Sequence, residues 1–215
     1  MIDAVVFDLD GLLIQTEELW DEVREQLARE RGGSYDAQSQ RDMMGMSSPE
    51  WSRYMHERVG LPESPDEIAA EVIEQMAARY RERLPLIDGA VEAVERIGAR
   101  WPLGLASSSN RPLIDLVLEL SGLGRLFRAT VSSEEVGRGK PAPDVYLEAC
   151  RRLGVEPARA AAVEDSHAGI GAGKAAGMRV IAIPNASFPP GNEALAEADV
   201  VRGSLAELTP AAVEE

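Results

Sequence analysis

The stretch VVFDLDGLLIQTEELW, residues 5–20, contains the clearest indication of the fold. An apolar run ends in Asp8, Asp10 follows two positions later, and Gly11 comes directly after it. A continuous apolar run is typical of a strand buried on both faces of a parallel sheet. Residues two apart on a strand point to the same face, so the two carboxylates are predicted to lie together where this strand ends.

Length and composition limit the classes of protein to consider. The chain has 215 residues, 45% of them apolar, which is enough for one large domain or for a domain with a smaller insert. The net charge of −15 disfavours nucleic acid and anionic membranes as partners. Cys150 is the single cysteine, so no intramolecular disulfide is expected, and no window reaches the length of a membrane span. We therefore expect a cytoplasmic protein, and a monomer is the default oligomeric state.

After the first strand, the hydrophobic residues recur at the period of helices. Residues 17–31 and 48–59 follow this spacing, and a further helix is predicted to start at residue 64. Residues 15–87 therefore indicate a run of helices without a convincing strand.

Beyond residue 88, helices alternate with short apolar strands, which predicts a parallel, doubly wound sheet. The fold class is therefore α/β: a Rossmann-like core of residues 1–14 and 88–215, interrupted after its first strand by an all-helical insert of residues 15–87. The later strands are expected at residues 102–107, 129–132, 160–164 and 180–183, with an edge strand at 198–201.

Polar residues follow the ends of these strands, where ligands bind in open α/β sheets. A hydroxyl cluster at residues 107–109 follows the second strand, Lys140 lies in the loop after the third, and Glu164 and Asp165 end the fourth. Each of these residues could also be an ordinary turn or helix-capping residue, and Lys140 could be a solvated loop lysine.

Four carboxylates at one edge of a sheet repel one another unless a cation neutralises them. Asp8, Asp10, Glu164 and Asp165 offer only oxygen atoms, which suits a hard ion such as Mg²⁺. Lys140 supports this interpretation, because the chain has twenty arginines and only two lysines. A loop that needed only positive charge would be expected to carry Arg.

These groups together favour phosphoryl transfer. An ionised carboxylate is a nucleophile that a phosphate dianion repels, and Mg²⁺ together with Lys140 would remove that repulsion. A second carboxyl group two residues away can protonate the leaving oxygen and then activate water. Asp8 is therefore predicted to be the nucleophile and Asp10 the acid/base.

With these residues in order, the sequence resembles the phosphatase branch of the haloacid dehalogenase superfamily over nearly the whole chain. The first motif of that family, DxDGxL followed by Thr or Ser, corresponds to residues 8–16. The strand-end Ser or Thr corresponds to Ser107, the lysine to Lys140 in KPAPDVY, and the acidic pair to Glu164 and Asp165.

The resemblance implies catalytic and metal-binding roles. Asp8 is expected to be the nucleophile and a Mg²⁺ ligand, and Asp10 the acid/base that also offers its backbone carbonyl to the metal. Asp165 is expected to bind Mg²⁺ directly, and Glu164 directly or through water. The helical insert corresponds to the cap that closes over the site in this branch.

The resemblance also implies the substrate contacts. Ser107 is expected to hold a phosphate oxygen, and Lys140 to steady the nucleophile and the transferring group, so both also count as catalytic. Leu9, Thr16 and Ser108 are expected to contact the substrate as well. The implied substrate is a small phosphate monoester, with sugar and polyol phosphates favoured.

Three positions depart from the usual pattern. Gln15 stands where members usually have Asp beside the hinge, so the hydrogen bonding of the hinge is expected to differ. Relatives that isomerise glucose phosphates carry a histidine and an arginine where this chain has Trp20 and Ser48. A phosphosugar mutase stays as the alternative function, and a non-catalytic phospho-receiver as an alternative of another class.

The insert also contains residues that could face a substrate, namely Met43, Met44, Met46, Trp51 and Tyr54. Methionine and aromatic residues at helical spacing belong more often to a hydrophobic core, and we expect that role here.

Overall fold

The chain, in a computed structural model that describes residues 1–43 and 46–215, contains one parallel sheet with the strand order β3-β2-β1-β4-β5-β6. The sheet confirms the predicted α/β class, and each strand pairs with its neighbours in parallel. Its strands are β1 (Ala4–Phe7), β2 (Leu103–Ser107), β3 (Phe127–Ser132), β4 (Ala160–Glu164), β5 (Arg179–Ala182) and β6 (Val200–Val201).

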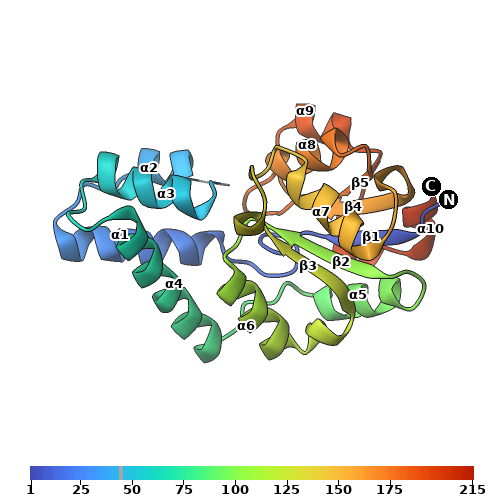
Figure 1. Cartoon of the computed structure of the whole chain (residues 1–215), viewed down its shortest axis with the longest axis horizontal. Helices are drawn as coiled ribbons and strands as arrows, with labels where there is room; N and C mark the ends of the chain where they lie inside the picture. The colour runs from blue at the N-terminus through green and yellow to red at the C-terminus, as the bar shows by residue number, and fades with distance from the viewer. Residues whose placement is uncertain (44–45) are drawn as a thin grey trace.

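Helices cover both faces of this sheet, as the continuous apolar strands predict (Figure 1). Val5 packs in one hydrophobic cluster, and its neighbour Val6 packs in the other. The cluster around Val5 includes residues of α5 (Ala90–Gly98), α6 (Arg111–Ser121) and α10 (Pro210–Glu214). The cluster around Val6 includes residues of α7 (Asp144–Leu153), α8 (His167–Ala175) and α9 (Asn192–Glu197). Single turns of 3-10 helix occupy Leu123–Arg125, Ser133–Glu135, Pro157–Arg159 and Leu205–Glu207.

Four helices between β1 and α5 lie together beside the sheet, and we call them the helical insert (Figure 1). They are α1 (Glu17–Arg31), α2 (Ala37–Met43), α3 (Ser48–Tyr54), which continues as a π-helical turn at Met55–Val59, and α4 (Pro65–Glu82). Ser64 caps α4 by accepting a hydrogen bond from the backbone of Glu67. Among the described residues, no helix combines the length and hydropathy that crossing a bilayer requires.

The two connections between the sheet and the helical insert run side by side. The backbone N–H of Gln15 donates to the carbonyl of Pro85 at 2.8 Å, and that of Ile87 donates to the carbonyl of Leu13 at 2.9 Å. The side-chain oxygen of Gln15 accepts a hydrogen bond from Asn185 at 2.7 Å. Its Nε2 atom is buried and finds no partner in the described parts of the chain. Among the described residues, the side chain of Gln15 therefore bonds to the core through its oxygen and not through its nitrogen.

The methionine and aromatic residues of the insert are mainly packing residues, as expected. Met43 and Trp51 are buried, with 1% and 2% of their surfaces exposed. Met46 and Tyr54 are partly buried and pack against the same core. Met44 lies outside the described residues.

Candidate active site

Three carboxylates meet where the strand order of the sheet reverses. Asp8 follows β1 directly, Glu164 ends the adjacent strand β4, and Asp165 follows it. Their exposed fractions are 5%, 0% and 6%. The side chains therefore lie buried at the switch point, the position where open α/β sheets bind ligands.

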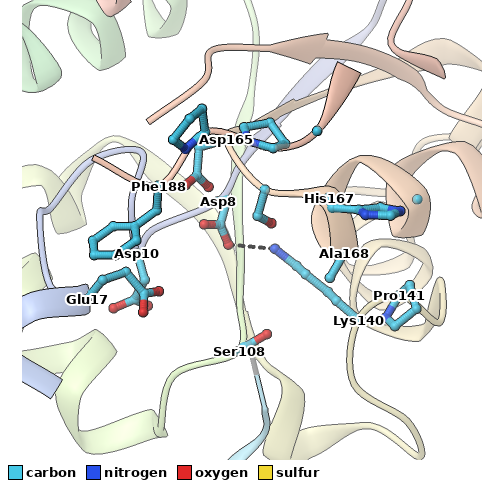
Figure 2. Close-up of a pocket in the computed structure, with 15 residues that line it drawn as sticks. Asp8, Asp10, Glu17, Ser108, Lys140, Pro141, Asp165, His167, Ala168 and Phe188 are labelled. Atoms are coloured by element: carbon cyan, nitrogen blue, oxygen red, sulfur yellow. Dashed lines mark hydrogen bonds and ion pairs between the residues drawn. The ribbon is translucent and has the colours of Figure 1, made fainter. Parts of the chain in front are cut away.

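Lys140 joins the carboxylates of the two strands. Its Nζ atom donates to Asp8 Oδ1 at 2.5 Å (Figure 2). It also donates to Glu164 Oε1 at 2.5 Å and to the carbonyl of Ala106 at 3.1 Å. The ammonium also lies 5.0 Å from the ring centre of Tyr146. With 4% of its side chain exposed, Lys140 is a buried cation and not a solvated loop lysine.

The charges of this cluster shift one another's pKa values. Burial and the neighbouring carboxylates of Glu164 and Asp10 together raise the pKa of Asp8 to about 8, against the opposing effect of Lys140. Burial also disfavours the charged form of Lys140, but Asp8 and Glu164 outweigh it and the pKa of Lys140 is raised. The carboxylates of Asp8 and Glu164 therefore keep the buried ammonium of Lys140 charged.

Asp8, Glu164 and Asp165 fit a metal site. One oxygen atom from each lies within 4.8 Å of the others. Asp165 Oδ1 is buried and has no hydrogen-bond partner among the described residues. Gly11 permits the close approach of Asp165: its φ is +85°, and a Cβ atom there would lie 2.2 Å from Asp165 Oδ2. Crowded carboxylate oxygens with an unused acceptor suit a hard cation such as Mg²⁺.

Glu164 is already held by several donors. Its Oε1 atom accepts hydrogen bonds from Lys140 and from the hydroxyl of Tyr146, the latter at 2.6 Å. Its Oε2 atom accepts from the backbone N–H of Asp165 and from the hydroxyl of Ser166, both at 3.2 Å. Glu164 therefore positions Lys140 and the loop after β4 whether or not it also contacts a metal.

Adding Mg²⁺ is expected to raise the melting temperature of the protein, because the ion would neutralise the buried carboxylates. At a concentration 100 times Kd, the stabilisation would be about 2.7 kcal/mol. Differential scanning fluorimetry with Mg²⁺ and with a chelator measures this without any substrate. Asp165→Asn should lose most of the shift, whereas Asp115→Asn, at an aspartate with 62% of its side chain exposed, should keep it. Equal shifts in all three proteins would contradict a metal site at Asp165.

Asp10 accepts hydrogen bonds from three hydroxyl groups. Its Oδ1 atom accepts from Thr16 at 2.9 Å, and its Oδ2 atom accepts from Ser107 at 3.1 Å and Ser109 at 2.7 Å. The Ser107 oxygen also accepts from the backbone N–H of Ser109 at 2.9 Å. These contacts fix the direction of Asp10 from both β2 and the start of α1.

The predicted substrate-binding residues occupy different places around this cluster. Ser108 lines the cavity described below, together with Lys140. Ser107 and Thr16 are fully buried, and their hydroxyls are directed to Asp10. The side chain of Leu9 packs in the core with 1% of its surface exposed, so a substrate contact of Leu9 would have to come from its backbone.

The charged cluster opens into a cavity of about 570 Å³ that Asp8, Asp10, Ser108, Lys140 and Asp165 help to line. Figure 2 shows Asp10, Glu17 and Phe188 on one side of Asp8 and His167 and Pro141 on the other. A smaller cavity of about 60 Å³ continues from Asp10, Glu17 and Ser108 to residues of the helical insert, namely Trp20, Arg24, Met43, Met46, Ser48 and Trp51. A ligand at Asp8 would therefore meet residues of both the core and the insert.

Sequence reasoning did not identify Glu17, Tyr146 or Phe188 as members of this site, and it included Ser109 only as part of the hydroxyl cluster. Burial raises the pKa of Glu17, and the nearby carboxylate of Asp10 raises it further. Glu17 directly follows Thr16 of the first motif, and Tyr146 ends the KPAPDVY segment. Their closeness to these motifs could have indicated that both residues lie near the site. Phe188 comes from the loop after β5, where no motif pointed to it.

Comparisons with known proteins identify the family to which the chain is similar. A family model described as haloacid dehalogenase-like hydrolase matches residues 2–177. The chain is 35% identical over 212 residues to hexitol phosphatase B of Escherichia coli (strain K12), covering 96% of this chain and 94% of that protein. It is 32% identical over 207 residues to the bifunctional riboflavin kinase/FMN phosphatase of Arabidopsis thaliana, covering 95% of this chain but only 54% of that longer protein.

A solved structure also matches the whole chain. The crystal structure of CbbY from Rhodobacter sphaeroides in complex with phosphate has a TM-score of 0.89 and 29% sequence identity to this chain, and the match covers 100% of both. The similarity therefore extends over the sheet and the helical insert together.

Proposed function

Because this chain belongs to the haloacid dehalogenase-like hydrolases, we propose that it is a Mg²⁺-dependent phosphatase that hydrolyses a sugar or polyol phosphate through an aspartyl phosphate on Asp8. The names hexitol phosphatase and FMN phosphatase describe phosphoric monoester hydrolases and support that class here. In a hexitol phosphate and in FMN, a polyol chain carries the phosphate.

The observation that carries the proposal is the contact between Lys140 and Asp8. The ammonium holds one oxygen of Asp8 at 2.5 Å, and Asp8 lines the cavity. Lys140 would offset the repulsion between this carboxylate and a phosphate dianion, and Ser108 would donate to a phosphate oxygen from the same cavity. A bound Mg²⁺ would supply further positive charge at Asp8 and Asp165, which Glu164 could support directly or through water.

The reaction divides into two displacements at phosphorus. In the first, a carboxylate oxygen of Asp8 forms a bond to phosphorus while the bond to the leaving alkoxide breaks, and Asp10 gives that oxygen its proton. In the second, Asp10 takes a proton from water as the water oxygen attacks phosphorus, and the Asp8–phosphorus bond breaks. The products are inorganic phosphate and an alcohol, and both carboxyl groups return to their first state.

The hydroxyl cluster around Asp10 suits this change of protonation. Thr16, Ser107 and Ser109 contact the carboxylate, and each hydroxyl can either donate or accept a hydrogen bond. When Asp10 carries a proton, one of these hydroxyls can rotate to accept it, so Asp10 keeps its position in both states. The helical insert, as the proposed cap of residues 15–87, would close the site against bulk water.

The mutase alternative is not favoured, because hexitol phosphatase B and the bifunctional riboflavin kinase/FMN phosphatase are named for phosphatase activity. Trp20, at the position of the mutase histidine, packs against Trp51 and Arg24. Ser48, at the position of the mutase arginine, donates to the side-chain oxygen of Asn110 at 2.9 Å. Neither side chain offers a charged group to a sugar phosphate.

Phosphate release from a panel of sugar, polyol and nucleotide monophosphates tests the proposal, with Mg²⁺ and with a chelator. We expect many equivalents of phosphate per protein chain in Mg²⁺ and a loss of at least about 100-fold in chelator. Release of one equivalent or less would indicate a phospho-receiver. Conversion of glucose 1-phosphate to glucose 6-phosphate with a bisphosphate primer, accompanied by little phosphate release, would indicate a mutase.

A further inference from the structure

A buried arginine of the helical insert takes no part in the steps proposed above. Arg24 lies on α1, with 8% of its surface exposed. The central carbon of its guanidinium group lies 5.0 Å from the ring centre of Trp20 and 5.0 Å from that of Trp51. The two indole rings lie 5.9 Å apart, measured between their centroids. The guanidinium group therefore packs against the two apolar indole rings.

The protein compensates the charge of Arg24 only in part. Its Nε atom is buried and has no hydrogen-bond partner among the described residues. Burial lowers the pKa of the guanidinium group, and the opposing effects of Tyr35, Glu17 and Asp21 do not restore it. A buried donor without a partner destabilises the fold, and a ligand that supplies the acceptor would explain why this one persists.

The position of Arg24 indicates which part of a ligand could supply that acceptor. Arg24 lines the cavity of about 60 Å³ that Asp10, Glu17 and Ser108 also line. In the proposed function, Asp10 protonates the oxygen that leaves from phosphorus, so the leaving group must extend from Asp8 past Asp10. Asp10 and Arg24 line the same cavity, so the distal arm of a leaving group placed there would reach Arg24.

We propose that Arg24 is a specificity-determining residue that donates hydrogen bonds to hydroxyl groups on the arm of the substrate farthest from the phosphate. This inference rests on the proposed function and adds to it the residue that would select polyol and sugar monophosphates. Glu17, on the same cavity wall, would accept hydrogen bonds from these hydroxyls. The indole rings of Trp20 and Trp51 would pack against the carbon chain.

A neutral hydroxylated arm fits this cavity better than a second phosphate. The carboxylate of Glu17 shares the cavity with Arg24, so a distal dianion would face a negative group as well as the guanidinium group. A hydroxyl group both donates and accepts, and can therefore satisfy Glu17 and Arg24 together. A volume of about 60 Å³ also suits a few hydroxylated carbons more than a solvated phosphate.

The test compares two substrates that have the same carbon chain length, sorbitol 6-phosphate and n-hexyl phosphate. The wild-type enzyme should favour the hydroxylated substrate in kcat/KM. In Arg24→Met, we expect kcat/KM for sorbitol 6-phosphate to fall about 10- to 100-fold, mainly through KM, which is the range of a charge-assisted hydrogen bond. The value for n-hexyl phosphate should change by less than about threefold. Arg24→Lys should recover part of the discrimination.

The matched control is Arg29→Met on the same helix, because 73% of the Arg29 side chain is exposed. It should leave both substrates unaffected. Melting temperatures distinguish binding from packing: Arg24→Met removes a poorly compensated buried cation, so its melting temperature should not fall. A fall accompanied by equal losses for both substrates would identify a structural role and overturn the inference.

The wild-type enzyme provides a test that does not depend on the folding of any variant. Equal kcat/KM for sorbitol 6-phosphate and n-hexyl phosphate would overturn the inference while leaving the phosphatase intact. A preference for fructose 1,6-bisphosphate that Arg24→Met abolishes would show that Arg24 binds a distal anion, and would also overturn it. Absence of Mg²⁺-dependent release from all of these esters, and from acetyl phosphate, would instead contradict the proposed function itself.

Discussion

An Asp8→Asn variant is expected to release phosphate at least about 10³-fold more slowly than the wild-type protein while keeping its fold. The amide has the shape of the carboxylate but is a very weak nucleophile. Its oxygen can still accept the hydrogen bond from Lys140, and one negative charge leaves a crowded group of three buried carboxylates. The loss should therefore appear in kcat, and the melting temperature should not decrease.

Steady-state phosphate release and thermal unfolding of the same preparation measure both parts of this expectation. Asp88→Asn, at an exposed aspartate, is the matched control and should retain activity within about twofold. An Asp8→Asn protein that keeps a tenth or more of the wild-type rate would show that another group attacks phosphorus. The aspartyl phosphate on Asp8 would then have to be abandoned.

Lys140→Met should combine a large loss of stability with a large loss of activity. The ammonium pairs with Asp8 and Glu164 and is 4% exposed, so its removal leaves two buried carboxylates without a counter-charge. Breaking a buried ion pair from one side costs about 3–5 kcal/mol. Activity should fall as well, because the carboxylate of Asp8 would lose the donor that positions it. Denaturant unfolding and phosphate release measure the two effects.

The other lysine of the chain is a suitable control. Lys174 pairs with Asp199 at 2.8 Å, but 36% of its side chain is exposed. Lys174→Met should therefore cost no more than about 1 kcal/mol and leave phosphate release unaffected. Mg²⁺ should recover part of the stability of Lys140→Met, since the ion would neutralise the same carboxylates. If both variants lost stability equally, the buried ammonium would not have the role described here.

Strongly patterned elements of this fold are predictable from the sequence. The helix predicted at residues 17–31 and the strand expected at 160–164 coincide with α1 and β4. Helix α2 is not predicted, because AQSQRDM has no apolar stripe and only Ser39 and Met43 are buried. Such a short polar helix depends on its tertiary contacts and not on its own sequence pattern.

The meeting of carboxylates at the site is predictable because strands β1 and β4 are parallel and end at one edge. The sequence does not predict which of Ser107, Ser108 and Ser109 contacts Asp10 and which lines the cavity. The turn after β2 sets the direction of each hydroxyl, and no sequence period describes that turn. Arg24 illustrates a second limit. Its helical position is clear from the sequence, but its burial depends on how α1 and α3 pack, which follows from tertiary structure alone.

The central position of β1 in the sheet also affects when the sheet can form during folding. Val5 lies beside Leu103 on one side and beside Ala161 on the other, so both neighbours of β1 come from distant parts of the chain. Closing such long loops costs entropy before any contact forms, and sheets of this kind fold slowly. During synthesis, one edge of β1 stays unpaired until β4 has emerged from the ribosome. Asp8 is therefore synthesised long before the strand that completes its surroundings, and chaperone protection would matter most during that interval.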